Sequence, residues 1–446
     1  MQVREVLDVY GRRYSIGESD HELLGRPRSR IAWLSGIAML VTGTAQYGFG
    51  ALVPTLGQRW SLVELCWAFA LWTACQAGIA FPAAWLRERN LLPPRHALVL
   101  GAALSAIGLL TLGLADHLPA LHLGYSVLGG IGTGLVYATC VGTVIRWFPD
   151  RVTGRIALIT GAFALGGVPF ALAAGLWLDV TDRAAFLSVA ALVVLVVVTA
   201  CGLPLRDPPR NWWPADVDPR RRELRTHRSN RPAIRHFKPG EAVRSGVLVP
   251  MYVTVVFAAA VSLFDLVFLA GLAVDVVPGD AVPGGTAFAA VALAVLAASA
   301  GAGRILAGRI SEAIGRRLTL RLAMATGGVA QLVLLFGAQR QDAAALLVGA
   351  GVAGLGTSCC YSLLVGLVRE YFGEDTAPLN FAVIYSAKAL GGVVGVGLAS
   401  LVVVSHGYPG TFLTAALLGV AGAVLGGRFS RPGRPHHLLP RPREAS

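Results

Sequence analysis

The chain has 446 residues, of which 55% are apolar and 14% are charged. Soluble proteins carry about 25% charged residues, so this composition excludes an ordinary water-soluble globular protein. The formal net charge of +13 is a property shared with nucleic-acid-binding proteins, and the positions of the basic residues decide whether that explanation applies here.

Apolar segments of about 20 residues recur along the whole chain, and each is long enough to cross the hydrocarbon core of a lipid bilayer. The residues before the first segment, 1–30, are polar and lack the apolar centre of a signal peptide, so they predict a retained N-terminal tail. Twelve membrane-spanning helices are predicted, at 31–57, 62–85, 96–115, 121–145, 153–178, 184–204, 246–272, 284–308, 318–338, 343–368, 379–404 and 409–427.

A polar stretch at 205–245 separates the first six spans from the last six. It is rich in Arg and Pro and has no helical period, which predicts a linker. Its Trp212 and Trp213 are expected at the level of the lipid headgroups, where aromatic side chains collect. The predicted parts are an N-terminal tail (1–30), an N-terminal six-helix bundle (31–204), the linker (205–245), a C-terminal six-helix bundle (246–427) and a C-terminal tail (428–446).

The basic residues are strongly biased toward alternate loops. If the N-terminus lies inside, the predicted outer loops contain only Arg59, Arg183 and Arg340, and two more basic residues, Arg304 and Lys388, lie deep within spans. The tails, the linker, the inner loops and the inner ends of the spans hold the rest of the 38. This positive-inside pattern predicts a multi-pass protein of the inner (cytoplasmic) membrane with both termini in the cytoplasm. It also explains the net charge, so no nucleic-acid partner is expected.

The cysteines and histidines do not form a recognisable site. The six cysteines lie in apolar segments without the spacing of metal ligands, and the histidines are scattered through tails and loops. The cysteines are expected to be small buried apolar residues. Neither a metal, a cofactor nor an enzymatic nucleophile–base pair is predicted.

The two halves of the chain repeat each other. GIGTGLVYATCVG at 130–142 aligns with GLGTSCCYSLLVG at 354–366 at an offset of 224 residues, and Glu88 aligns with Glu312 at the same offset. A duplicated six-span unit in the same orientation is the parallel-repeat arrangement of transporters, in which two halves rock about a site near the bilayer midplane. The fold class is therefore all-α, with twelve spans in two six-helix pseudo-repeats.

Two basic residues, Arg304 and Lys388, lie within spans 8 and 11. A charge at the centre of a spanning helix costs about 2.5–3.5 kcal/mol on insertion scales, so such residues usually line a functional cavity. Lys388 is one of only two lysines in the chain. The offset of 224 places Arg304 opposite Ala80, and the match of ALGG at 164–167 with ALGG at 389–392, at an offset of 225, places Lys388 opposite Phe163. The predicted depths of the two cations differ by about 6–8 Å, which long side chains can bridge. Two cations in one cavity predict an anionic substrate.

Other polar residues in the spans have two explanations each. Gln46, Tyr47 and Gln76 either line the cavity or hydrogen-bond between helices, and the repeat-related Tyr137 and Tyr361 either donate hydroxyls to the substrate or pack as aromatic rings. Asp265 is a possible proton carrier or outer gate, or else a solvated helix-end residue. Glu88, Glu312, Arg316 and Arg317 lie in matching inner loops and are predicted to act as conformational latches, meaning contacts that hold one transport state closed.

The twelve spans, the basic linker and the loop GRISEAIGRR resemble the major facilitator superfamily. The loop is similar to the signature G-x-x-x-D-R-x-G-R-R, with Glu312 in place of Asp and Ala313 in place of the first Arg. A closer resemblance is to the oxalate/formate antiporter family. It is carried by AQYGFGAL in span 1, QAG at 76–78, GTGLVY followed by RWFPDR at 146–151, GR at 303–304 and AKA around Lys388.

The resemblance implies a small carboxylate bound between an Arg on span 8 and a Lys on span 11, within an aromatic cage. It assigns the ion-pairing roles to Arg304 and Lys388. Phe163 stands where the family pattern has a Tyr and Thr357 where it has a Trp, so a roomier pocket and an acid larger than oxalate are expected. The implied substrate-binding residues are Arg304, Lys388, Tyr361, Tyr137, Tyr47, Gln46, Gln76, Phe163 and Thr357.

The expected function is exchange of small mono- or dicarboxylates across the membrane by alternating access, carried out by a monomer. A proton-coupled carboxylate symporter that uses Asp265, or a drug or solute efflux transporter of the same superfamily, is the alternative. A membrane receptor is a third class, and movement of any solute by the protein would exclude it.

Overall fold

The computed structural model describes residues 4–7, 13–16, 18–178, 182–215, 217, 230, 231, 233, 235–277, 281, 282 and 285–432. Within these residues, 12 helical segments are long and apolar enough to cross a membrane. Each of them coincides with one predicted span, so the twelve-span prediction is confirmed. Large apolar side chains such as Trp177 and Leu417, exposed by 71% and 69%, cover the outside of the helices, as lipid-facing surfaces require.

The first six spans form the N-terminal half, and several of them consist of more than one helix. The helices are α2 (Ser29–Tyr47) and α3 (Phe49–Leu56), α4 (Leu62–Gly78) and α5 (Ala80–Glu88), α6 (Pro94–Leu114), α7 (Leu118–Leu121) with the π-helix η1 (His122–Gly129) and α8 (Gly130–Trp147), α9 (Val152–Leu165) and α10 (Gly167–Trp177), and α11 (Arg183–Gly202).

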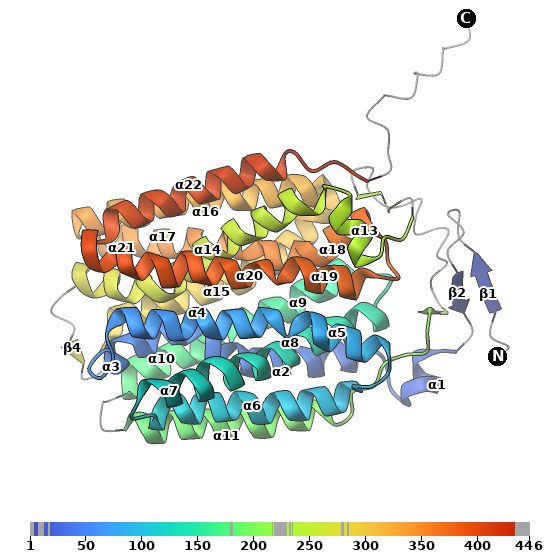
Figure 1. Cartoon of the computed structure of the whole chain (residues 1–446), viewed down its shortest axis with the longest axis horizontal. Helices are drawn as coiled ribbons and strands as arrows, with labels where there is room; N and C mark the ends of the chain where they lie inside the picture. The colour runs from blue at the N-terminus through green and yellow to red at the C-terminus, as the bar shows by residue number, and fades with distance from the viewer. Residues whose placement is uncertain are drawn as a thin grey trace, which may run out of the picture.

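The last six spans form the C-terminal half. The helices are α14 (Leu248–Val276), α15 (Ala287–Ile314), α16 (Arg316–Arg340), α17 (Ala343–Leu355) with the short 3-10 helix η3 (Thr357–Cys359) and α18 (Cys360–Phe372), α19 (Ala377–Tyr385) and α20 (Ala387–Gly392) with the π-helix η4 (Val393–Leu398) and α21 (Ala399–His406), and α22 (Tyr408–Gly426). Figure 1 shows the two halves as two stacked layers, blue to green and yellow to red, whose helices run along the same direction.

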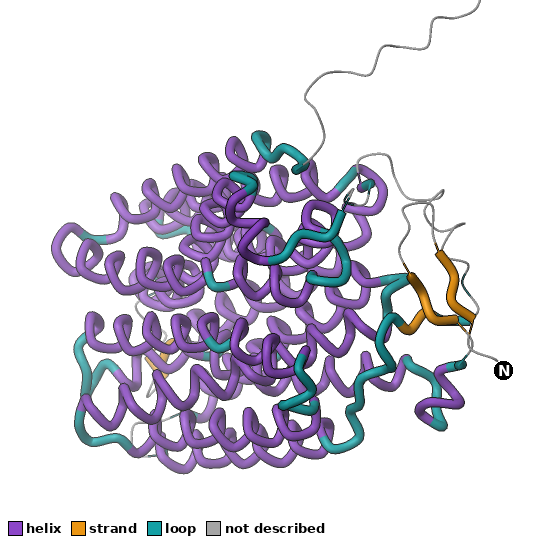
Figure 2. Tube along the Cα trace, turned by 45° about the vertical axis from the view of Figure 1, so that its right-hand side comes forward, coloured by secondary structure: helices purple, strands orange, loops and turns teal. Residues whose placement is uncertain are grey.

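Small extramembrane elements collect at one end of the bundle. They are β1 (Arg4–Leu7), β2 (Arg13–Ile16), β3 (Trp212–Trp213), α1 (Asp20–Leu24) and α13 (Pro239–Arg244), whereas β4 (Ala281–Val282) and β5 (Gly285–Thr286) pair at the opposite end. Strand β2 pairs antiparallel with β1 and parallel with β3, and the three strands form a flap beside the helices (Figure 2).

Trp212 and Trp213 are not exposed to lipid, as interfacial aromatic side chains would be. Both side chains are buried, because the Trp213 ring packs 4.7 Å from the Tyr14 ring and the Trp212 ring 5.1 Å from the Trp147 ring, measured between centroids. The N-terminal tail thus covers the start of the linker. The linker also contains one helical turn that its composition did not predict, α13.

The predicted end of span 8 is wrong. Helix α15 ends at Ile314, beyond the predicted end at 308, and Gly315 with φ 96° breaks it from α16. Arg304 therefore lies ten residues before the end of α15, and Lys388 lies eleven residues after the start of α19. At about 1.5 Å per residue, the two residues lie at similar distances from these helix ends.

Candidate functional site

Arg304 is buried between the two halves and is held by three oxygen atoms. Its Nη1 donates to the carbonyl oxygen of Thr160 at 2.6 Å, and its Nη2 donates to the hydroxyl of Tyr47 at 2.5 Å, both in the N-terminal half. Its Nε donates at 3.2 Å to the carbonyl oxygen of Ser358, which belongs to η3 of the C-terminal half. All of these acceptors are neutral, so the guanidinium keeps its positive charge uncompensated.

Lys388 is also buried and also reaches across to the N-terminal half. Its Nζ donates to Oε1 of Gln46 at 2.6 Å and to Oε1 of Gln76. Arg304 and Lys388 share one aromatic neighbour, because the Tyr361 ring centroid lies 5.1 Å from Cζ of Arg304 and 5.7 Å from Nζ of Lys388. The two cations predicted from the sequence are thus brought together, with no acidic partner in the described part of the chain.

Aromatic rings surround the two cations. The Phe163 ring meets the rings of Tyr47 and Tyr137 edge-on, with centroids 6.1 and 5.3 Å apart, and Tyr137 stacks on Tyr385 at 4.9 Å. Sequence analysis missed Tyr385, whose ring centroid lies 5.7 Å from Nζ of Lys388 and 6.2 Å from the Tyr361 ring. Its position three residues before Lys388 is the signal that could have identified it, because residues i and i+3 share a helix face.

Several polar atoms in this aromatic cage are buried and have no hydrogen-bond partner among the described residues. They are the hydroxyls of Tyr137 and Tyr361 and Nε2 of Gln76. The Tyr137 hydroxyl lies near Tyr385 and the Tyr361 hydroxyl near Ser262, but neither reaches hydrogen-bonding geometry. Buried polar groups normally find partners, and all three of these atoms can donate. Together with the two cations they form a site that favours an acceptor-rich anion.

Two predicted site residues lie deeper in the C-terminal half. Thr357 packs against α16, since a Cβ atom at Gly327 would collide with the Thr357 methyl group. Asp265 is 1% exposed and accepts a hydrogen bond from Nε2 of Gln331 on α16 at 3.1 Å. The explanation of Asp265 as a solvated helix-end residue is therefore wrong, because its carboxyl group is buried inside the C-terminal bundle.

Of the four predicted latch residues, Arg316 is the one that connects the halves. Its guanidinium bonds to Oγ1 of Thr153 in the N-terminal half at 2.8 Å and pairs with Glu370. Arg317 donates instead to the carbonyl oxygen of Gly426, within the C-terminal half. Glu88 and Glu312 form no ion pair among the described residues, and Glu312 is exposed. A cross-half contact missed from the sequence is Arg369, which donates to the carbonyl oxygen of Pro149 at 3.3 Å.

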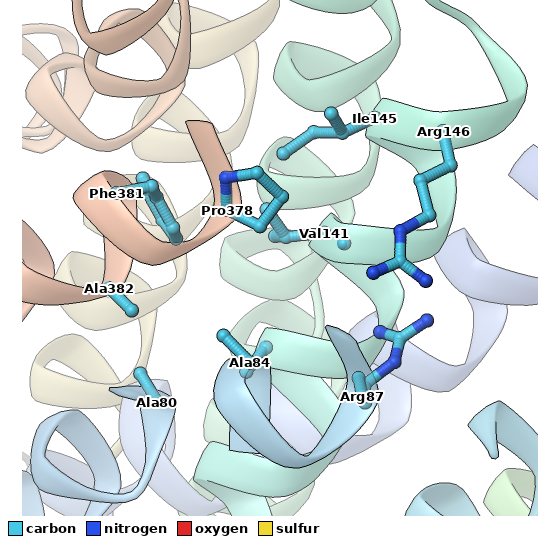
Figure 3. Close-up of a pocket in the computed structure, with 11 residues that line it drawn as sticks. Ala80, Ala84, Arg87, Val141, Ile145, Arg146, Pro378, Phe381 and Ala382 are labelled. Carbon is cyan, nitrogen blue, oxygen red and sulfur yellow. The ribbon is translucent and has the colours of Figure 1, made fainter. Parts of the chain in front are cut away.

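A small pocket lies near the same end of the molecule, where α5 and α8 meet α19. Figure 3 shows the guanidinium groups of Arg87 and Arg146 side by side at its edge. Both groups bond to Asp207, which follows α11: Nη2 of Arg87 lies 2.9 Å from its carboxylate and Nη1 of Arg146 lies 2.7 Å away. Because Arg87 is 4% exposed, Asp207 is the counter-charge that permits its burial.

Replacing Asp207 by Asn is expected to destabilise the protein by about 3 kcal/mol, because breaking a buried ion pair leaves a charge without its partner. The measurement is thermal unfolding of the purified protein in detergent. Asp116→Asn is the matched control, since its pair with Arg59 is exposed and should contribute less than about 1 kcal/mol. Equal losses in the two variants would contradict a special role for the buried pair.

Comparisons with known sequences agree with this architecture. Residues 35–306 and 284–446 match the family model of the Major Facilitator Superfamily. The oxalate:formate antiporter of Oxalobacter formigenes is 24% identical over 380 residues, which cover 84% of each chain. An uncharacterized 38 kDa protein of Thermoproteus tenax is 26% identical over 89% of this chain and 94% of its own. Monocarboxylate transporter 11 of Mus musculus is 28% identical over 41% of each chain.

Solved structures give the same fold at lower identity. The human organic anion transporter MFSD10 superposes with a TM-score of 0.62 at 16% identity, over 90% of this chain and 100% of its own. The proton:xylose symporter XylE superposes with a TM-score of 0.67 at 15% identity, over 90% and 95% of the two chains. The family model covers most of the chain and twelve spans are present, so the chain belongs to the major facilitator superfamily of multi-pass membrane transporters.

Proposed function

We propose that the protein transports small organic anions of the mono- or dicarboxylate class, bound between Arg304 and Lys388. The observation that carries this proposal is the combination of two buried cations and nearby buried donors that find neither an acidic partner nor an acceptor in the part of the chain that the structure describes. A carboxylate supplies acceptors and negative charge together. Arg304 presents a planar fork that suits a carboxylate, whereas Lys388 supplies a point charge.

Exchange is the mode of transport that this electrostatic arrangement favours. Moving two desolvated cations together through the closed state costs free energy, and neutral oxygens offset only part of that cost. A bound anion offsets more of it, so the loaded carrier changes conformation faster than the empty one. Each transport step in one direction then needs an anion for the return step.

The relatives support the same substrate class. The antiporter of Oxalobacter formigenes is named for oxalate and formate, and the mouse relative is named for monocarboxylates. The distribution of basic residues supports insertion into the inner membrane with both termini in the cytoplasm. With that orientation, the start of α16, which carries Arg316, and the end of α18, which carries Arg369, lie on the cytoplasmic side. The pairing of β4 with β5 lies on the outer side (Figure 1).

The test is counterflow in proteoliposomes that contain the purified protein. Vesicles are loaded with an unlabelled carboxylate, and entry of a labelled mono- or dicarboxylate is followed from a panel that includes oxalate, formate and larger acids. Accumulation of label that requires the internal carboxylate supports anion exchange. Uptake driven only by an imposed proton gradient would support the symport alternative, and no movement of any carboxylate would overturn the proposal.

The identity of residue 163 is expected to affect substrate size. Phe163 lies between the rings of Tyr47 and Tyr137 and contributes no hydroxyl to the cage. A hydroxyl at this position would add a hydrogen bond of about 0.5–1.5 kcal/mol that benefits a small, closely held dianion most. We expect malonate or a hydroxy acid to compete better than oxalate in the wild type, and Phe163→Tyr to move the preference toward oxalate. Competition in the counterflow assay measures this, and oxalate as the tightest wild-type ligand would contradict it.

A further inference from the structure

A second group of buried polar atoms lies inside the C-terminal half, apart from the anion cage. Nε2 of Gln331 donates to Oδ2 of Asp265 at 3.1 Å and to the carbonyl oxygen of Gly327 at 3.3 Å. The remaining oxygens of this pair, Oδ1 of Asp265 and Oε1 of Gln331, are buried and have no hydrogen-bond partner in the described part of the chain. Two acceptors therefore lie in the membrane interior without a donor.

Thr357 lies on the neighbouring span 10, near this pair. The Tyr361 hydroxyl is near Ser262 of α14. Thr357 precedes Tyr361 by one helical turn and Asp265 follows Ser262 by one turn, and both steps lead toward the same end of the bundle. Thr357 also packs against Gly327, whose carbonyl oxygen binds Gln331. Its hydroxyl is buried and meets no hydrogen-bond partner within the described ranges, whereas that of the repeat-related Thr133 lies 3.3 Å from the Ser105 hydroxyl.

Asp265 has no positively charged partner in the described part of the chain. Arg304 and Lys388 point toward the N-terminal half. On the elements packed against α14, no titratable group among the described residues forms an ion pair or hydrogen bond with Asp265. These groups are Arg304, Arg309 and Glu312 of α15, Arg316, Arg317, Arg321 and Arg340 of α16, Cys359 of η3, Tyr385 of α19, Lys388 of α20, Tyr408 of α22, Glu241 and Arg244 of α13, and Lys238 just before α13.

An ionised carboxylate in this place would be a buried charge with one neutral hydrogen bond, which is strongly unfavourable. A proton on Oδ1 removes the charge and supplies the donor that the group lacks, without any change in the surrounding helices. We propose that Asp265, together with Gln331 and Thr357, forms a proton-binding site within the C-terminal bundle, and that its proton stabilises the anion-binding conformation of Arg304.

The link to Arg304 runs through the helix break in span 10. Thr357 begins η3, and the carbonyl oxygen of the next residue, Ser358, accepts from Nε of Arg304. Loss of the proton would leave a negative charge on Asp265, behind the three-residue turn η3. The charge would favour movement of η3 toward water. The carbonyl oxygen of Ser358 would then no longer accept from Arg304. Irregular helices at membrane depth occur where they line or support binding sites. This link to transport rests on the proposed function, whereas the proton site itself does not.

The proton is tested directly by infrared spectroscopy of the purified full-length protein. A buried protonated carboxyl group gives a carbonyl band distinct from that of ionised carboxylates. We expect the band at neutral pH in the wild type and in Asp275→Asn, a control on the same helix whose carboxyl is exposed, and its loss in Asp265→Asn. Gln331→Leu should shift the band, because it removes the amide that donates to Oδ2. A neutral-pH spectrum without an Asp265 band would overturn the site whether or not the protein carries carboxylates.

The link to transport is tested by counterflow with the same pH on both sides of the membrane. From neutral to alkaline pH, exchange by the wild type and by Asp275→Asn should fall about fivefold or more, the lower range of coupling between two sites. Exchange by Asp265→Asn should stay constant, since the amide is neutral at every pH. Equal pH profiles in the three proteins would overturn the coupling. Exchange is also compared in choline and in sodium buffers. If sodium is required and the infrared band is absent, the site binds a sodium ion in place of the proton, and the proton proposal is overturned.

Discussion

Replacing Lys388 by Gln is expected to abolish anion exchange while the protein still folds and inserts. The ammonium is buried and held by Gln46 and Gln76, and removing one charge from a desolvated ion pair costs about 2–5 kcal/mol, which is about thirtyfold or more in affinity. Lys388→Arg should retain little activity, because a planar guanidinium does not fit a position built for a point charge. Counterflow at a substrate concentration below saturation measures both variants.

The chain contains its own control for this experiment. Lys238 is the other lysine, and it is exposed in the linker just before α13. Lys238→Gln removes the same charge from the same residue type and should leave exchange unchanged. Near-normal exchange by Lys388→Gln would show that the buried lysine is a packing residue and would remove half of the proposed anion site.

Arg304→Lys is expected to be as damaging as the loss of the charge itself. A lysine keeps the positive charge but cannot make the three hydrogen bonds to Thr160, Tyr47 and Ser358, nor can it bind a carboxylate through a fork. We expect exchange to fall by about a hundredfold, or nearly 3 kcal/mol. Arg309→Lys, an exposed position on the same helix, is the control and should behave like the wild type.

A purely structural role for Arg304 has a different signature. If the residue only holds the halves together, Arg304→Lys should lose thermal stability but keep the additional stabilisation that saturating carboxylate gives the wild type. If Arg304 binds the anion, that stabilisation should disappear even where the variant is folded. Thermal unfolding in detergent with and without the substrate separates the two roles.

The membrane spans and the two cations could be predicted from the sequence because the bilayer penalises exceptions. A span must be apolar over its length, so Arg304 and Lys388 stand out, and so do Gln46 and Gln76, which proved to be the partners of Lys388. The end of α15 was misplaced because the apolar segment is interrupted at Arg309, whereas a helix leaving the membrane continues until a residue such as Gly315 breaks it.

Other parts of the site could not be predicted because their signal is not specific. An aromatic residue in an apolar span, such as Tyr385, looks the same whether it packs or lines a cavity. The acceptors for Arg304 at Thr160 and Ser358 are backbone carbonyls, which every residue possesses. The burial of Trp212 depends on pairing with the N-terminal strands, nearly two hundred residues away in sequence. Such long-range pairings leave no local pattern.

The linker makes fixed contacts with both halves. The length of chain between these contacts limits how far the two halves can separate. Trp213 is buried against Tyr14 on the side of the N-terminal half. Asn230 is fixed to the C-terminal half, where it donates to the carbonyl oxygen of Ser311 and accepts from the backbone N–H of Arg316. At about 3.3 Å per residue, the sixteen residues between Trp213 and Asn230 limit the distance between these two contacts to about 50 Å. A rocking motion that took the two contacts farther apart would have to release Trp213 or Asn230.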